Sequence, residues 1–300
     1  MNKTKVWISS MRLRTLPLSI SGIILASFLA AYQGVFNWGI CVLAILSTLS
    51  FQILSNLAND YGDGVKGTDN DDRIGPERAI QSGEISPKEM KRAIKLNVFI
   101  SIVLALLTIY VAFGRSNFLL STFFIALGIA AIIAAIKYTV GGNAYGYNAM
   151  GDIFVFLFFG LASVIGGYVL FAKSIDFIVV LPAISVGLLS TAVLNLNNMR
   201  DIESDTKSNK ITLALKLGAK KAKTYHNILI ISAIVISVLF GLLFYKSVYN
   251  FIFIIAFVPL FVHLKKVNQT KNPQHFDPEL KKLALTTVLL AILMGVGQLL

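Results

Sequence analysis

Nine stretches of this chain are long, apolar and almost free of charge, and they restrict its fold more than any other feature. Hydrophobic residues make up 56% of its 300 residues and charged residues only 14%, whereas soluble domains average about 25% charged residues. About 20 apolar residues suffice for an α-helix to cross a bilayer. The stretches cover about 15–34, 38–58, 95–113, 117–136, 153–172, 176–196, 227–245, 249–264 and 283–300. The sequence therefore predicts an all-α integral membrane protein with about nine transmembrane helices.

The charged residues lie almost entirely on one side of these stretches. If the N-terminus is cytoplasmic, 24 of the 27 Lys and Arg residues fall in cytoplasmic segments, and only Arg115, Lys173 and Lys246 fall outside. This bias is the positive-inside rule. The net charge of +12 is thus explained by topology and by attraction to anionic lipid. No soluble basic domain is present, so we expect the lipid bilayer, and no nucleic acid, as a partner.

The second apolar stretch ends in a cluster of amide and carboxylate side chains. If the helix continues, Asn56, Asn59, Asp60 and Asp63 share one face, because they are spaced by three and four residues. Oxygen ligands of this kind suit Mg²⁺, which takes one or two carboxylates together with waters and substrate phosphates. Glycines and turn-forming residues follow, and Ser86 with Glu89 predicts the start of the next helix.

A second cluster ends the sixth apolar stretch and matches the first. Asn197, Asp201 and Asp205 have the spacing of a continuous helical face, and Asn197 and Asp201 lie 141 residues after Asn56 and Asp60. Four stretches separate the clusters, so both halves have the same orientation. We interpret this as two parallel four-helix repeats plus a final helix. The alternative is that the Asp-rich loops, about 59–94 and 197–226, are merely solvated.

Brought together, the two faces would offer oxygen ligands for Mg²⁺ beneath a ring of basic residues. The candidate bases are Lys66, Arg73, Arg78, Arg200 and Lys207. Carboxylates that hold Mg²⁺ and are surrounded by bases would bind a diphosphate, while apolar helix walls would accept a long tail. The pattern therefore indicates a site for a polyprenyl diphosphate. A transporter is disfavoured, because its ionisable residues would lie near the middle of the bilayer.

Other polar residues near the same membrane face have either a structural or a functional interpretation. Arg12 and Arg14 either anchor the first helix or bind an anionic group. Tyr138 is either an interfacial belt residue or a substrate contact, and Asp152 opens the fifth apolar stretch. The three histidines are scattered without ligand spacing, and we expect them to be non-catalytic.

Four segments resemble the UbiA-type membrane prenyltransferases. They are the R-x-x-T-L-P pattern at 12–17, SNLANDYGDGVKGTD with DRIGP at 55–76, KYTVGGNAYGYNAMGDI at 137–153 and LNLNNMRDIESDTKSNKITLALKLG at 194–218. Within this superfamily they are similar to the branch that prenylates 1,4-dihydroxy-2-naphthoate in menaquinone synthesis. The chain departs from the wider pattern at Gly67, where a third aspartate is often found and for which Asp69 is a substitute.

The resemblance implies one transmembrane prenyltransferase domain over 1–300, with the helices around a central cavity. It places the first metal motif on Asn59, Asp60 and Asp63 and the second on Asp201 and Asp205. Arg12, Arg14 and Tyr138 would contact the aromatic substrate. Asp63, Asp201 and Asp152 are the candidate catalytic residues, with Asp152 accepting a phenolic proton.

The implied reaction is the Mg²⁺-dependent transfer of a polyprenyl group from polyprenyl diphosphate to 1,4-dihydroxy-2-naphthoate. Carbon dioxide is lost, and demethylmenaquinol and diphosphate are formed. Another aromatic acceptor, such as 4-hydroxybenzoate, is the alternative. The implied location is the inner (plasma) membrane, with the site facing the cytoplasm.

Overall fold

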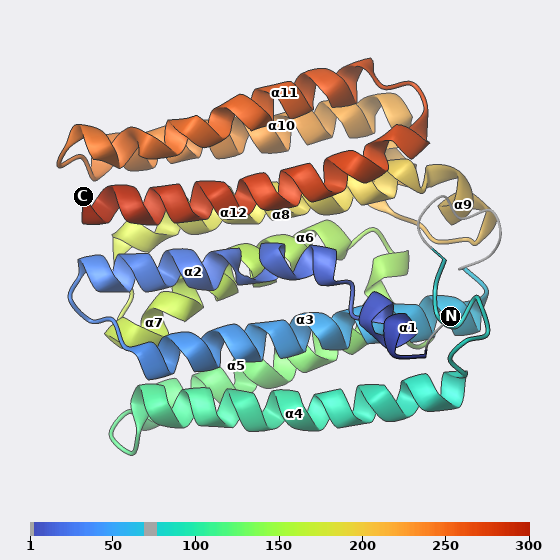
Figure 1. The fold of residues 1–300 in the computed structure, drawn as a ribbon, viewed down its shortest axis with the longest axis horizontal. Helices are drawn as coiled ribbons and strands as arrows, with labels where there is room; N and C mark the ends of the chain where they lie inside the picture. The colour runs from blue at the N-terminus through green and yellow to red at the C-terminus, as the bar shows by residue number, and fades with distance from the viewer. Residues whose placement is uncertain (1–2, 69–76) are drawn as a thin grey trace.

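The computed structural model describes residues 3–68 and 77–300, and within these ranges the chain forms helices and no strands (Figure 1). Most of the long helices run along the longest axis of the molecule. The α-helices are α1 Lys3–Ser10, α2 Leu16–Tyr32, α3 Trp38–Lys66, α4 Pro87–Phe113, α5 Phe118–Lys137, α6 Gly151–Val155, α7 Gly167–Ala172, α8 Val180–Arg200, α9 Ile202–Lys207, α10 Leu213–Leu243, α11 Phe257–Gln269 and α12 Asp277–Leu299. The other helical segments are η1 Leu13–Thr15, η2 Tyr145–Tyr147, η3 Phe156–Gly166, η4 Phe177–Val179, η5 Val248–Ala256 and η6 Pro273–Phe276.

The predicted membrane spans correspond to nine helical segments of the described chain. Eight of them are long and apolar enough to cross a bilayer, and the ninth, Leu16–Tyr32, is shorter at 17 residues. Two spans are composite: α6, η3 and α7 form Gly151–Ala172, and η5 with α11 forms Val248–Gln269. Eleven residues of the fifth span, Phe156–Gly166, are π-helical. The prediction of an all-α multi-pass membrane protein is confirmed.

Local sequence signals explain where the helices of the first polar loop begin and end. The Ser86 side chain accepts from the backbone N–H of Glu89, whose carboxylate accepts from the Ser86 N–H, so α4 begins with the predicted capping box. Helix α3 continues through the first polar cluster as expected. It ends at Gly67, whose φ of 72° lies in the left-handed region that favours glycine. This ending is a physical reason for glycine at position 67.

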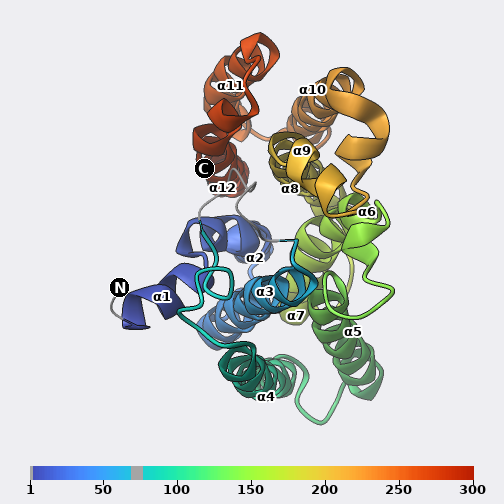
Figure 2. The same cartoon turned by 90° about the vertical axis from the view of Figure 1, so that its right-hand side faces the viewer.

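The two helices that carry the polar clusters end at the same end of the bundle. The ends of α3 and α8 lie on the right in Figure 1, close to α1 and α9, and Figure 2 looks onto this end. Helix α8 packs against α10 and η3, while α2 packs against α12 and α3. A Cβ on Gly160 of η3 would lie 2.6 Å from Cα of Gly187 in α8, so the two backbones approach closely there. This packing sets one wall of the cavity described next.

Candidate active site

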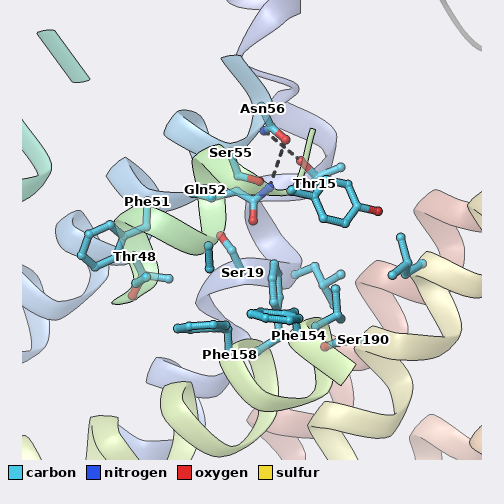
Figure 3. A pocket seen from close by; sticks show the side chains of 18 of the residues that line it. Thr15, Ser19, Thr48, Phe51, Gln52, Ser55, Asn56, Phe154, Phe158 and Ser190 are labelled. Carbon is cyan, nitrogen blue, oxygen red and sulfur yellow. Dashed lines mark hydrogen bonds between the residues drawn. The ribbon is translucent and has the colours of Figure 1, made fainter. Parts of the chain in front are cut away.

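A cavity of about 430 Å³ opens at the end of the bundle where the polar clusters lie. Its walls come from α2, α3, α4, α5, α6, η3, α7, α8, α9 and the beginning of α12. Polar side chains of both clusters line one part, and the remainder is apolar and aromatic. Figure 3 shows this change from Gln52, Ser55 and Asn56 toward the parallel rings of Phe154 and Phe158. The cavity therefore suits a ligand with a charged head and an apolar tail.

The first cluster presents Asp63 and Asn59 to the cavity. Asp63 Oδ1 accepts from the Tyr147 hydroxyl at 2.8 Å, and its Oδ2 lies 3.4 Å from Lys210 Nζ. Asn59 Oδ1 accepts from Thr139 Oγ1 at 3.3 Å. Gly62 permits this arrangement, because a Cβ there would lie 2.5 Å from Thr139 Oγ1.

Asn56 lines the cavity, but its amide is used within the protein. Its Nδ2 donates to the Met11 carbonyl at 2.8 Å. The same Nδ2 donates to Thr15 Oγ1 at 3.4 Å, and Oδ1 accepts from Gln52 at 3.1 Å (Figure 3). Asn56 thus fastens the segment before α2 onto α3. Its predicted role as a metal ligand stays a prediction that would require these bonds to rearrange.

Asp60 lies behind the cavity wall and is fully buried. Among residues 3–68 and 77–300 neither carboxylate oxygen has a hydrogen-bond partner, and Arg78 Nε lies 3.7 Å from Oδ1. A buried carboxylate without hydrogen bonds is unfavourable. The predicted role of Asp60 as a metal ligand stays a prediction, because its carboxylate does not line the cavity.

The second cluster is held by a buried arginine. Arg200 is 2% exposed, and its Nε and Nη2 donate to the two oxygens of Asp201 at 2.8 Å each. Its Nη1 donates to Asp277 at 2.6 Å and its Nη2 also donates to Asn197 at 2.9 Å. Arg200 lines the cavity, but its donors are directed to these three side chains. We predicted a diphosphate contact for Arg200, whereas the observed geometry makes it a clamp on Asp201.

The continuous helical face predicted for the second cluster is wrong. Helix α8 ends at Arg200, and Asp201 has non-helical φ and ψ of −98° and 9° before α9 begins at Ile202. The break lets Asp201 turn back to Arg200. Asn197, Asp201 and Asp205 nevertheless all line the same cavity.

Lys210 joins the two clusters, and it was not among the residues predicted for the site. Its ammonium lies 3.4 Å from Asp63 of the first cluster. Burial by itself would lower the pKa of Lys210, but the carboxylates of Asp63 and Asp205 outweigh it and raise the pKa. Lys210 is therefore a fixed positive charge at the place where the two halves of the site meet.

The remaining predicted bases are distributed unevenly. Arg78 lines the cavity. The Lys66 ammonium lies 3.9 Å from the centre of the Tyr147 ring, and the residue is exposed outside the cavity lining. Lys207 is paired with Glu203 at 3.8 Å on the exposed side of α9, away from the cavity. Arg73 and Asp69 lie outside the described residues.

The apolar part of the cavity begins with a ladder of rings. Tyr138 lies edge-on to Tyr145 at 5.2 Å, and Tyr145 stacks on Phe154 at 3.9 Å. Burial raises the pKa of Tyr138 to about 12, so its hydroxyl stays protonated near neutral pH. Arg12 lines the cavity from the segment before α2, and the side chain of Arg14 lies outside the description.

Asp152 lies behind the cavity wall, although it is next to lining residues. It is 5% exposed and shares a hydrogen bond with Tyr225 of α10. Its neighbours Gly151 and Phe154 line the cavity, whereas Asp152 does not. Its role as the proton acceptor stays a prediction, and this position does not favour it.

Two of the histidines described as scattered are in contact. His226 Nε2 lies 3.0 Å from His263 Nε2, and His263 Nδ1 lies 2.9 Å from Glu279. Lys266 and Lys282 also pair with Glu279. This group is outside the cavity lining. It fastens α10, α11 and α12 together, in agreement with a non-catalytic role.

The donors around the cavity fit Mg²⁺ better than they fit a metal enclosed by protein. Within residues 3–68 and 77–300, no three His, Cys, Asp or Glu side chains converge to enclose an ion. Mg²⁺ usually takes only one or two carboxylates and completes its shell with waters and substrate phosphates. Asp63, Asp201 and Asp205 line one cavity and suit such binding. Asp60, behind the cavity wall, is a fourth carboxylate close to them.

These features define a class: helical membrane proteins in which two acidic motifs, from two similarly oriented halves, meet over an apolar cavity. Residues 20–295 match the model of the UbiA prenyltransferase family. The chain belongs to this family.

Two curated relatives are similar to this chain over almost their full length. The 1,4-dihydroxy-2-naphthoate octaprenyltransferase of Haemophilus influenzae is 43% identical over 300 residues, covering 99% of this chain and 96% of that protein. The enzyme of the same name from Escherichia coli is 42% identical over 297 residues, covering 97% and 95%.

Solved structures share the fold at low identity. A UbiA homolog from Archaeoglobus fulgidus, bound to DMAPP and Mg²⁺, superposes with a TM-score of 0.60 at 16% identity, covering 95% of this chain and 99% of that one. A UbiA homolog from Aeropyrum pernix K1, solved without ligand, gives a TM-score of 0.62 at 15% identity, covering 97% and 96%.

Proposed function

We propose that this protein transfers a polyprenyl group from polyprenyl diphosphate to 1,4-dihydroxy-2-naphthoate in a Mg²⁺-dependent reaction that forms demethylmenaquinol. The observation that carries the proposal is the single cavity that joins Asp63, Asp201 and Asp205 to an apolar, aromatic interior. The two relatives named for this acceptor at 42% and 43% identity support the choice of naphthoate.

The polar end of the cavity binds the diphosphate. Asp63, Asp201 and Asp205, with Asn59 and the buried Asp60, would hold Mg²⁺, which neutralises the leaving diphosphate when bound. Lys210 and Arg78 contribute fixed positive charge beside these carboxylates. Preorganised positive charge at the leaving group is usually the largest single contribution to lowering the barrier of such a reaction.

The aromatic part of the cavity orients the two reacting carbons. The allylic C–O bond breaks, and diphosphate leaves with the electron pair. The carboxylate-bearing ring carbon then forms the new C–C bond with a π electron pair of the ring. The bond from this carbon to the carboxylate breaks, carbon dioxide leaves, and the electron pair of that bond restores the aromatic ring. Phe154, Phe158 and Tyr145 exclude water from the allylic cation. Arg12, which lines the cavity near α2, is placed to bind the acceptor carboxylate.

The proposal also covers the domain organisation, the membrane and the orientation of the protein. We infer one catalytic domain over the whole chain, in the inner membrane of a bacterium, with the polar end of the bundle facing the cytoplasm. The bias of Lys and Arg toward this end supports that orientation.

The acceptor assignment is tested by pairing polyprenyl diphosphate with either 1,4-dihydroxy-2-naphthoate or 4-hydroxybenzoate, with and without Mg²⁺. We expect prenylated naphthoquinol and carbon dioxide only with the naphthoate and only with Mg²⁺. Product with 4-hydroxybenzoate alone would assign the chain to another branch. Transport of prenyl diphosphate across proteoliposomes without any product would refute the enzymatic reading.

Mg²⁺ binding should depend on pH through Asp205, which lies outside the membrane spans. Burial raises the pKa of Asp205 to about 7, with Lys210 opposing and Asp201 adding to the shift. Mg²⁺ binds the carboxylate form, so protons compete with it below pH 7. The apparent Mg²⁺ affinity should fall roughly tenfold per pH unit below about pH 7. Mg²⁺ titrations of activity at pH 6, 7 and 8 measure it. An Mg²⁺ requirement that is the same at all three pH values in wild type, or a pH dependence that persists in Asp205→Asn, would contradict this role.

A further inference from the structure

A second pocket lies at the opposite end of the bundle from the acidic cavity. It has a volume of about 390 Å³ and is formed where the end of α2, the beginning of η5 and the end of α12 meet. In Figure 1 this end is on the left, where the C-terminus is marked. The lining residues are Ala31, Tyr32, Lys246, Ser247, Asn250, Gly297, Gln298, Leu299 and Leu300. None of them belongs to the site described above.

Two buried amides of this pocket have polar atoms without a hydrogen-bond partner in the part of the chain that the structure describes. Gln298 is 4% exposed, and neither its Nε2 nor its Oε1 is hydrogen-bonded. Asn250 is 1% exposed; its Oδ1 accepts from the backbone N–H groups of Lys246 and Ser247 at 2.9 and 2.8 Å, but its Nδ2 is unpaired. Buried polar groups in native proteins are nearly always paired with protein, water or a ligand, so these unpaired amides are available to bind a polar ligand in the pocket.

The only charged side chain among the nine lining residues is a lysine. The ammonium of Lys246 lies 4.2 Å from the centre of the Tyr32 ring, and this cation–π contact holds it beside the pocket. Lys246 is also one of only three basic residues that the charge pattern places at this end. The nearby carboxylate of Asp176 is already bonded to Gln33 at 3.1 Å and to the Ile178 N–H at 3.0 Å.

We propose that this pocket binds an anionic phosphate group, supplied by a phospholipid head group at this end of the membrane span. Lys246, Asn250 Nδ2 and Gln298 Nε2 are the donors for its oxygens, and Gln298 Oε1 accepts from a head-group hydroxyl. Exposed apolar residues border the pocket, with Val248 71% and Leu300 65% exposed, and they would contact the acyl chains. Free phosphate has the same chemistry but would leave these apolar contacts unused.

Native mass spectrometry of the full chain in neutral detergent tests the proposal. The probes are dioleoyl phosphatidylglycerol, dioleoyl phosphatidylcholine and inorganic phosphate. We expect one phosphatidylglycerol to bind about tenfold more tightly than phosphatidylcholine, since charge-assisted hydrogen bonds favour the anion. Lys246→Gln and Gln298→Met should lose this preference. Lys173→Gln, at the same end but outside the pocket, should keep it.

The controls separate binding from folding. Each variant should have the wild-type melting temperature without lipid and unchanged prenyl transfer, because the pocket is remote from the acidic cavity. If inorganic phosphate displaces the lipid from wild type but not from Lys246→Gln, the pocket binds an anion, but its ligand is free phosphate and the assignment to a lipid head group is overturned. Equal affinity for both lipids in wild type, or a preference that survives in both pocket variants, would overturn the proposal.

Discussion

Asp63→Ala and Asp201→Asn should each lower prenyl transfer by about 10²- to 10³-fold or more at saturating substrate, because each removes a carboxylate from the polar end of the cavity. Turnover in detergent, measured over a range of Mg²⁺ concentrations, gives the size of the loss. Asn is chosen at position 201 because it preserves an oxygen for Arg200, which is buried and would otherwise lose its main partner.

A nearby acidic residue supplies the control for these two variants. Glu203 lies on α9 between Asp201 and Asp205, but its side chain is 80% exposed and pairs only loosely with Lys207. Glu203→Gln should therefore retain wild-type turnover. Full activity in a folded Asp63→Ala or Asp201→Asn variant would refute the assignment of the two clusters to the metal–diphosphate site.

Lys210→Met should reduce kcat/KM for the prenyl diphosphate by about 10²-fold, since it removes a half-buried positive charge that contacts Asp63. Because the neutral side chain has a similar length, the packing around Tyr147 should be kept. Steady-state kinetics at fixed naphthoate and varied prenyl diphosphate measures the effect.

Lys207→Met is the matched comparison, because that lysine is three residues away and exposed on α9 outside the cavity. We expect it to change kcat/KM by less than about twofold, as exposed ion pairs contribute little. If Lys207→Met were the more damaging substitution, the diphosphate would have to lie on the exposed side of α9.

The spans and the two clusters could be predicted because each depends on local sequence. Apolar length predicts a membrane helix, and Asn56, Asp60 and Asp63 stand on one continuous helix, so their spacing alone places them on one face. The capping box at Ser86 is equally local. These features required only the spacing of residue types.

Other features depend on contacts between distant segments or on a single irregular residue. Asn209 has a positive φ of 54°, and this turn brings Lys210 back to Asp63, which lies 147 residues earlier. The pairing of Arg200 with Asp277 and of His226 with His263 similarly joins helices that are far apart in the chain. No spacing rule reveals such contacts, so Arg200 could be placed near the site from sequence but not given its clamping role.

The Arg200 clamp makes the two halves of the cavity mechanically unequal. Asp201 is gripped at both oxygens, and Arg200 is itself tied to the first turn of α12 through Asp277, so this side keeps its shape without a ligand. Asp63 rests on one tyrosine hydroxyl and a long lysine contact, which an arriving cation can replace. A cation that binds in the cavity would therefore displace the partners of Asp63 more readily than those of Asp201.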